Sequence, residues 1–223
     1  MTNLIAGGYQ MPEFVARILS IEPVTPDVKA YRVQKPAGYT FLAGQATEVA
    51  VNKPGWTTEK RPFTFTSRGT DAWLEFTIKA YRNRNGVTKL LDTLGVGEEL
   101  LLHDVWGTLT YRGPGLFLAG GAGVTPFLSI FRDLSARGAI ATNRLVFANK
   151  TPDDIIRGAE LKTLLGSEFV SVVGDKRIDA TLVTGELKRH PEFIYLCGPD
   201  PMMEAVSAIV QEAGFGTRLV VED

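Results

Sequence analysis

The hydrophobic pattern of this chain changes at Gly113-Pro114-Gly115, and that change constrains its fold more than any other feature. Before it, Trp73–Lys79 alternates apolar and polar side chains, which is the pattern of a strand buried on one face only. After it, residues 116–119 are all apolar, which is typical of a strand buried on both faces. The 223 residues therefore predict two domains, residues 1–112 and 113–223.

The first domain is predicted to be an antiparallel β-barrel, because its apolar segments are short and are separated by glycine and proline. The one helix expected in it covers residues 87–94. The expected strands are residues 13–20, 28–34, 45–51, 61–67, 73–79 and 98–103.

In the second domain, apolar strands alternate with segments of helical periodicity. This alternation predicts an α/β fold with a doubly wound parallel sheet. The expected strands are residues 116–119, 145–148, 168–173, 193–196 and 217–221, and three of the expected helices are residues 153–165, 180–188 and 200–213. A further helix is expected where Phe127, Ile130, Phe131 and Leu134 fall at helical spacing, and it stops at Gly138.

Composition argues against several kinds of protein. The net charge of −1 provides no overall field for nucleic acid or membrane binding. One cysteine, Cys197, allows neither an internal disulfide nor an iron–sulfur cluster held by four thiolates of this chain, and His103 and His190 show no metal-site spacing. Because residues 1–10 lack the features of a secretory signal and no apolar run approaches about twenty residues, we expect a cytoplasmic protein.

Positive charge is concentrated between Lys53 and Lys89, where eight basic residues face three acidic ones. That window carries +5, so the rest of the chain carries −6. The window is interpreted either as an ordinary basic surface or as a site for cofactor phosphates, an acidic protein partner, or both.

Arg61-Pro62-Phe63-Thr64 is a cationic strand segment with chemistry suited to a flat, phosphorylated cofactor. An arginine can hold a diphosphate with two hydrogen bonds, an aromatic ring can pack on a flat ring, and a hydroxyl can reach a ring nitrogen. Downstream, Asn85-Gly86-Val87-Thr88 places a glycine and a hydroxyl residue at a helix start, which suits a phosphate. A salt-bridged strand and ordinary helix capping are the alternatives.

Three glycines in four residues join a buried strand to a helix in the segment Gly120–Pro126. Pro126 suits the first turn of that helix, whose N-terminus offers a site for a pyrophosphate. Cys197-Gly198-Pro199 follows another strand, and ligands of open α/β sheets bind at the carboxyl ends of strands. Both segments are therefore expected at one crevice, although a purely structural turn and a buried thiol are the alternatives.

In their order along nearly the whole chain, these segments resemble the ferredoxin–NADP reductase superfamily, in particular its short bacterial flavodoxin and ferredoxin reductases. The matching segments are Arg61-Pro62-Phe63-Thr64 with Ser67, Ile78-Lys79-Ala80-Tyr81, Gly86-Val87-Thr88, Gly120–Pro126, Leu196–Met202 and the acidic Glu222.

The resemblance implies a flavin, FAD rather than FMN, in the barrel and NADH or NADPH on the second domain. Hydride would pass from the nicotinamide to the flavin, and electrons would pass on to an acidic protein acceptor such as flavodoxin, ferredoxin or an oxygenase component. Catalytic roles are implied for Thr64, Cys197 and Glu222. The implied cofactor-binding residues are Arg61, Pro62, Phe63, Thr64, Ser67, Ile78, Lys79, Tyr81, Gly86, Val87, Thr88, Gly120, Gly121, Gly123, Val124, Thr125, Pro126, Cys197, Gly198, Pro199 and Met202.

The sequence departs from the family pattern at three places. Phe63 replaces the usual tyrosine, and the segment Asp104–Thr108 keeps only Gly107 of the usual Gly-Pro-x-Gly. Many relatives continue past the acidic residue to an aromatic that covers the flavin, whereas this sequence ends at Asp223. We therefore expect a more open flavin face, or cover from elsewhere.

Two other functions stay open: direct reduction of small acceptors such as quinones, ferric chelates or free flavin, and a non-catalytic electron-transfer subunit. The nucleotide preference leans to NADH, because Asp153 and Asp154 would repel a 2′-phosphate that Lys150 and Arg177 could bind, unless these acids merely start a helix. The protein is expected to be a monomer or a weak dimer.

Overall fold

The computed structural model describes residues 13–107, 109–140, 142–174 and 177–221. The first sheet is antiparallel, with the strand order β4-β3-β6-β1-β2-β5. Its strands are β1 (Phe14–Thr25), β2 (Val28–Gln34), β3 (Ala46–Val51), β4 (Arg61–Thr64), β5 (Trp73–Lys79) and β6 (Glu99–Trp106). The short helix α1 (Val87–Leu91) lies between β5 and β6 along the chain.

The chain beyond β4 closes this sheet into a barrel. Phe65 forms a bridge with Phe76 of β5, and the Thr66 N–H donates to the Glu75 carbonyl at 2.7 Å. The aromatic rings of Phe41 and Phe65 stack in the barrel interior with centroids 4.0 Å apart. The predicted antiparallel barrel is therefore confirmed, and its closure depends on one strand changing partners after Thr64.

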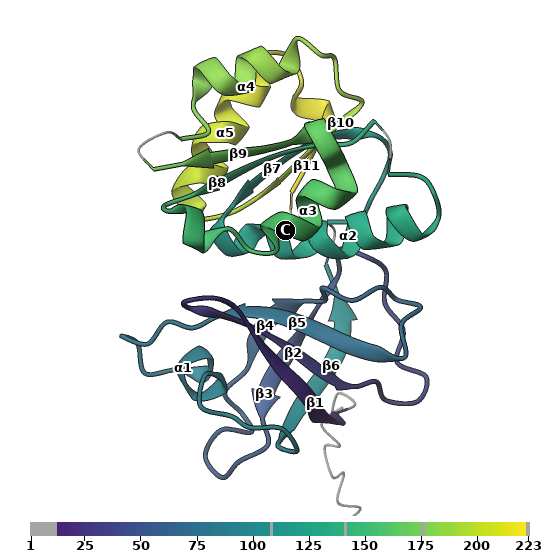
Figure 1. Cartoon of the computed structure of the whole chain (residues 1–223), viewed down its shortest axis with the longest axis vertical. Coiled ribbons are helices and arrows are strands. Elements are labelled where there is room, and N and C mark those ends of the chain that lie inside the picture. The colour runs from purple at the N-terminus through teal and green to yellow at the C-terminus, as the bar shows by residue number, and fades with distance from the viewer. Residues whose placement is uncertain (1–12, 108, 141, 175–176, 222–223) are drawn as a thin grey trace, which may run out of the picture.

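The second sheet is parallel, with the strand order β11-β10-β7-β8-β9. Its strands are β7 (Gly115–Gly120), β8 (Arg144–Asn149), β9 (Phe169–Val173), β10 (Phe193–Cys197) and β11 (Leu219–Val220). The helices are α2 (Thr125–Ala136), α3 (Gly158–Leu165), α4 (Ala180–Leu187) and α5 (Asp200–Glu212). Helices α2 and α3 cover the sheet face turned toward the barrel, while α4 and α5 cover the opposite face, which confirms the doubly wound fold (Figure 1).

Three elements differ from the sequence-based expectation. Strand β1 runs on to Thr25 because its first part, Phe14 to Arg17, pairs with β6 and the rest, from Ile18 to Thr25, pairs with β2. The helix expected over 153–165 is broken by Arg157, whose positive φ of 53° starts α3 only at Gly158. Strand β5 is buried on both faces rather than one, because α2 covers its outer face at Glu75.

The connection between the domains is anchored by Tyr195 of β10. Its hydroxyl accepts from the N–H groups of Arg112 and Gly113, at 2.9 and 3.0 Å, and donates to the Gly113 carbonyl at 2.8 Å. The boundary between residues 112 and 113 stays a prediction, and it falls within this anchored connection. Among the described residues, no helix is long and apolar enough to span a membrane.

Candidate functional site

The two glycine-containing turns predicted from the sequence lie directly against each other at the carboxyl ends of β7 and β10. A Cβ on Gly123 would lie 2.3 Å from the Cys197 carbonyl oxygen, and a Cβ on Gly120 would lie 2.5 Å from the Met202 sulfur. Only glycine permits this approach. Gly198 is less confined than Gly123, since the nearest atom to its Cβ position, at 2.9 Å, is the same side-chain sulfur rather than backbone. Close packing between turns thus accounts for these three glycines, and their contacts with a nucleotide stay predictions.

Gly121 differs from its neighbours, because nothing lies within 4 Å of its Cβ position and its φ is +53°. It begins a 3-10 turn, Gly121–Val124, that leads into α2. The Thr125 hydroxyl donates back to the Ala122 carbonyl at 2.9 Å, and no side chain caps the first N–H groups of α2. The 3-10 turn and α2 run on as one helical segment, since the Thr125 N–H donates to the Ala122 carbonyl. The N-terminal N–H groups of such a segment, beside the open Gly121, are suited to an anionic diphosphate.

Cys197 ends β10 in register with Ala119 of β7, so it lies at the sheet edge where the glycine turn begins. Its side chain is partly buried. The 3-10 turn Gly121–Val124 also contacts β5 of the barrel. The structure therefore brings the predicted nicotinamide turn, the thiol and the barrel wall to one interdomain seam, as the sequence predicted for the turn and the thiol.

Asn149, which the sequence analysis did not single out, ends β8 next to this seam. It is 8% exposed, and neither atom of its side-chain amide has a hydrogen-bond partner among the described residues. By strand alternation it shares the face of Leu145 and Phe147, which pack toward α2. A buried amide without partners is costly, about 1–3 kcal/mol, and so marks a place where a polar ligand group would be stabilising. In the sequence, only its position at the end of a strand could have pointed to this residue.

The predicted flavin strand β4 presents two exposed and two half-buried residues. Arg61 and Pro62 are exposed, while Phe63 packs partly against the barrel core and Thr64 pairs with Ala46 of β3. The Arg61 Nη1 atom donates to the neighbouring Lys60 carbonyl at 2.6 Å. No carboxylate of the described residues lies within ion-pair distance of Arg61, so its guanidinium is available to a diphosphate.

Ser67 has a structural contact rather than an open hydroxyl. It is 2% exposed, its hydroxyl accepts from the Glu75 N–H at 3.0 Å, and its carbonyl accepts from the Ser129 hydroxyl at 2.7 Å. Its predicted contact with a cofactor stays a prediction, and in this structure Ser67 joins the barrel to α2.

The second predicted flavin segment contains buried, paired and open residues. Ile78 and Val87 are buried in the barrel core, so any cofactor contact there would come from their backbone. The Lys79 ammonium is paired with Asp27 at 2.9 Å, which leaves it less suited to a phosphate than its charge suggested. Tyr81 is exposed beneath the Arg84 guanidinium. Gly86 precedes α1 with no side-chain cap, and Thr88 follows in its first turn.

Ion pairs reduce the surplus charge of the basic window. Lys53 is paired with Glu98, Arg68 with Asp71, Lys79 with Asp27, and Arg82 with Asp92. Four cations have no carboxylate within ion-pair distance in the described parts of the chain. These are Lys60, Arg61, Arg84 and Lys89. They flank β4 and the loop before α1, so the open positive charge lies where the flavin diphosphate is expected.

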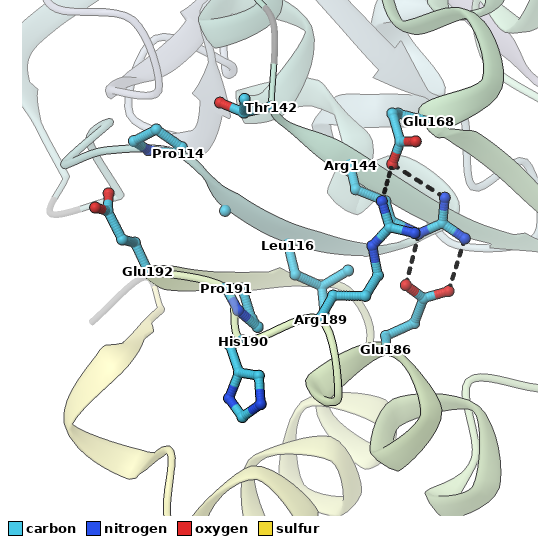
Figure 2. A pocket seen from close by; sticks show the side chains of 11 residues that line it. Pro114, Leu116, Thr142, Arg144, Glu168, Glu186, Arg189, His190, Pro191 and Glu192 are labelled. Carbon is cyan, nitrogen blue, oxygen red and sulfur yellow. Dashed lines mark hydrogen bonds and ion pairs between the residues drawn. The ribbon is translucent and has the colours of Figure 1, made fainter.

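A polar cavity also lies at the opposite edge of the parallel sheet. It is lined by the amino ends of β7 and β8, and Arg144 and Arg189 fill it with ion pairs to Glu168 and Glu186 (Figure 2). These ion pairs leave the cavity with less free positive charge for a nucleotide phosphate. No group of three or more metal-ligating side chains occurs among the residues described here. Glu222 lies outside the described residues, so its catalytic role stays a prediction.

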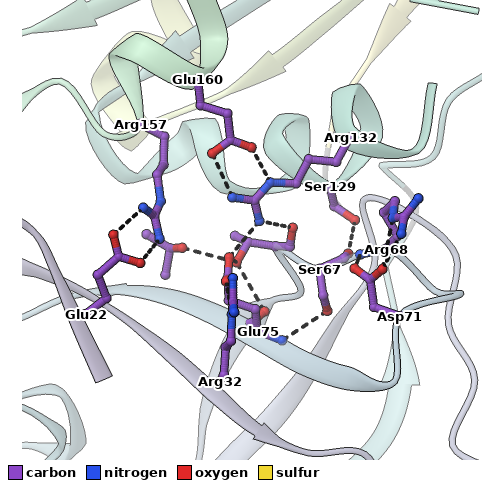
Figure 3. A network of polar contacts seen from close by, with 12 residues as sticks. Glu22, Arg32, Ser67, Arg68, Asp71, Glu75, Ser129, Arg132, Arg157 and Glu160 are labelled. Carbon is purple, nitrogen blue, oxygen red and sulfur yellow. Dashed lines mark hydrogen bonds and ion pairs between the residues drawn. The ribbon is translucent and has the colours of Figure 1, made fainter. Parts of the chain in front are cut away.

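A buried polar network, Ser67, Glu75, Ser129, Arg132 and Glu160, joins the domains beside the seam (Figure 3). Burial acts to raise the pKa of Glu75, but Arg132, Arg32 and Thr66 together lower it below its ordinary value. Burial likewise acts to lower the pKa of Arg132, and Glu160 and Glu75 raise it overall. Both groups are therefore charged at neutral pH.

Comparison with known proteins agrees with this architecture. Residues 117–208 match the family model for the NAD-binding domain of oxidoreductases. The reductase component of propane 2-monooxygenase from Rhodococcus jostii is 31% identical over 94% of this chain, and the chain spans 63% of that relative's length. NADH-cytochrome b5 reductase 1 from Emericella nidulans is 30% identical over 86% of this chain and 71% of its own.

The fold agrees with solved structures. A ferredoxin NADP+ reductase from Neisseria gonorrhoeae, with bound FAD and NADP, superposes with a TM-score of 0.80 over 94% of this chain and 97% of its own, at 19% identity. The cytochrome b5 reductase domain of Ulva prolifera nitrate reductase gives 0.78 at 21% identity. With 30% identity to a relative of which it covers more than two thirds, and with the barrel and the doubly wound sheet in the same order, this chain belongs to the ferredoxin–NADP reductase superfamily of flavoproteins.

Proposed function

We propose that this chain is an NAD(P)H oxidoreductase that transfers hydride from a nicotinamide nucleotide to bound FAD and passes the electrons to a protein acceptor. The observation that carries the proposal is the meeting of the Gly120–Pro126 turn and the Cys197–Pro199 turn against the barrel wall. That seam is where a nucleotide on the second domain and a flavin on the first would come together.

The flavin contacts are proposed from the open charge of the barrel. Arg61 would bind the diphosphate, with the uncapped backbone around Gly86 and Thr88 contributing N–H donors. Phe63 would pack along the flavin, and the Thr64 hydroxyl would hydrogen-bond to its reactive ring nitrogen. When bound, the flavin would accept a hydride and pass on the two electrons one at a time.

On the second domain, the backbone of Gly121 and the N-terminus of α2 would hold the nucleotide diphosphate. Thr125 and Cys197 would lie beside the nicotinamide, excluding water and holding the ring against the flavin. A deprotonated thiol would not be required, because the proposed hydride transfer would run directly between the two rings.

NADH is the proposed nucleotide, although Asp154 no longer supports that preference. Its carboxylate accepts from the Thr151 N–H and hydroxyl at 3.0 and 2.8 Å, so it caps the 3-10 turn Pro152–Asp154. Asp153 is exposed and remains the acid that would repel a 2′-phosphate. A protein acceptor is proposed because the relatives named above are reductase components of an oxygenase and a cytochrome b5 reductase. Its acidity is proposed from the four open cations that flank β4 and the loop before α1. A monomeric or weakly dimeric state stays a prediction.

An anaerobic titration of the purified, FAD-loaded protein with NADH and, separately, NADPH tests the proposal. Loss of the flavin absorbance near 450 nm, about one flavin reduced per nucleotide added, is the expected result. Dye reduction without transfer to any ferredoxin, flavodoxin or oxygenase component would instead favour a reductase of small acceptors. A yellow protein that neither nucleotide bleaches would contradict the proposed activity.

A further inference from the structure

Helix α2 connects the two predicted cofactor sites through hydrogen bonds, in addition to packing between them. Its first residue, Thr125, follows the nicotinamide turn. One turn later, the buried Ser129 hydroxyl donates to the Ser67 carbonyl at 2.7 Å. Arg132 Nη1 donates to the Thr66 carbonyl, also at 2.7 Å. Both carbonyls come from the chain directly after β4, within three residues of Thr64.

Charge pairing holds Arg132 in place for this contact. Figure 3 shows its guanidinium between Glu160 of α3 and Glu75 of β5. It contacts Glu160 with two hydrogen bonds of 2.5 and 2.8 Å and Glu75 with one of 2.6 Å. The Glu75 side chain is only 3% exposed, so this pairing is poorly screened by solvent. One guanidinium therefore fixes elements of both domains at once.

The geometry of an α-helix transmits this constraint to the site. Thr125 and Ser129 are four residues apart, about 6 Å along the helix axis. Because a packed helix moves as a rigid body, a shift at Ser129 displaces the nicotinamide turn by a similar amount. Hydride transfer needs the reacting atoms about 3–3.5 Å apart, and a 1 Å misplacement can cost about a hundredfold in rate.

We propose that Ser129 and Arg132 are positioning residues, which set the spacing between the nicotinamide turn and the flavin strand through the Thr66 and Ser67 carbonyls. The inference rests on the proposed function. Neither side chain needs to touch a cofactor, so both should affect the rate of hydride transfer far more than the affinity for either cofactor.

The test is anaerobic stopped-flow reduction of the FAD-loaded protein by NADH, and by NADH deuterated at the transferred position. The variants are Ser129→Ala and Arg132→Lys, which keeps the charge but loses the planar fork. Ser135→Ala is the matched control, a serine of the same helix whose hydroxyl makes no hydrogen bond with the described residues. Flavin content, half-saturating NADH and the melting temperature are measured in parallel.

We expect both variants to lower the limiting rate of flavin reduction by about tenfold or more, with a primary deuterium isotope effect. Bound flavin should remain stoichiometric, half-saturating NADH should change by no more than about twofold, and Ser135→Ala should match the wild type. Suppose that NADH reduces the wild type and that both variants show the wild-type limiting rate, with only their melting temperatures lowered. The positioning role is then wrong, while the proposed function stands. If the wild type is not reduced by either nucleotide, both fall together.

Discussion

Replacing Arg132 by methionine should destabilise the protein far more than its single positive charge would suggest. The Arg132→Met variant loses hydrogen bonds to the Thr66 carbonyl, Glu75 and Glu160. Breaking a buried ion pair from one side costs about 3–5 kcal/mol. Because Glu75 keeps its contact with Arg32 at 3.2 Å, we expect a loss of unfolding free energy at the lower end of this range, about 3 kcal/mol.

Urea denaturation at pH 7, followed by circular dichroism, measures this change against a matched control. Arg137 lies on the same helix, with its side chain 58% exposed and paired with Asp133 at 2.7 Å. Arg137→Met removes an exposed pair of this kind and should cost about 0.3–0.5 kcal/mol. By the usual scaling for 150–250 residues, Arg132→Met should also lower the melting temperature by about 6–12 °C.

The same variant carries a pH signature because the pKa of Glu75 is lowered in the folded protein. A lowered folded-state pKa stabilises the protein above the unfolded value of about 4.3, and that stability is lost as the pH falls through the folded value. The difference in unfolding free energy between wild type and Arg132→Met should therefore have its full size at pH 7 and shrink below about pH 4. A variant no less stable than Arg137→Met at pH 7, or a gap that widens in acid, would refute the buried-pair reasoning.

Three further predictions concern the seam and the flavin strand. Arg61→Ala should lose FAD on dialysis, whereas Arg17→Ala, which removes an exposed arginine of the same barrel, should retain it. The flavin absorbance that remains after dialysis measures this difference. Cys197→Ala should slow flavin reduction by NADH without loss of flavin, and an unchanged rate would leave the thiol a packing role only. Gly123→Ala should cost about 1–3 kcal/mol, because the added methyl would lie 2.3 Å from the Cys197 carbonyl oxygen; an unchanged melting temperature would mean that the turns separate freely.

Local sequence predicted most of the elements, because hydrophobic period and glycine placement are local signals. The alternation over Trp73–Lys79 became β5, and the apolar run at 116–119 became the centre of β7. The change of partner after Thr64 could not be predicted in this way. The run 61–67 looks like one strand, whereas pairing with β3 and then with β5 depends on how the barrel closes.

In the candidate site, too, residues with local sequence signals were found and residues that depend on distant contacts were missed. Turn residues such as Gly121 and Cys197 were found because they follow strands whose carboxyl ends meet at one sheet edge. Arg132 and Ser129 were missed because the carbonyls that they contact, those of Thr66 and Ser67, lie more than sixty residues earlier in the chain. Glu75 occupies a polar position of an alternating strand, which normally faces water, and only the packing of α2 over the barrel buries it.

The proposed function requires the two domains to bring a flavin and a nicotinamide nucleotide together at the seam between them. A crystal structure of the FAD-loaded protein with bound NAD⁺ measures this directly. We predict that the nicotinamide C4 atom lies about 3–3.5 Å from flavin N5, between Thr64 and Cys197. A nucleotide bound instead among Arg144, Glu168 and Glu186, at the amino ends of the parallel strands, would contradict it.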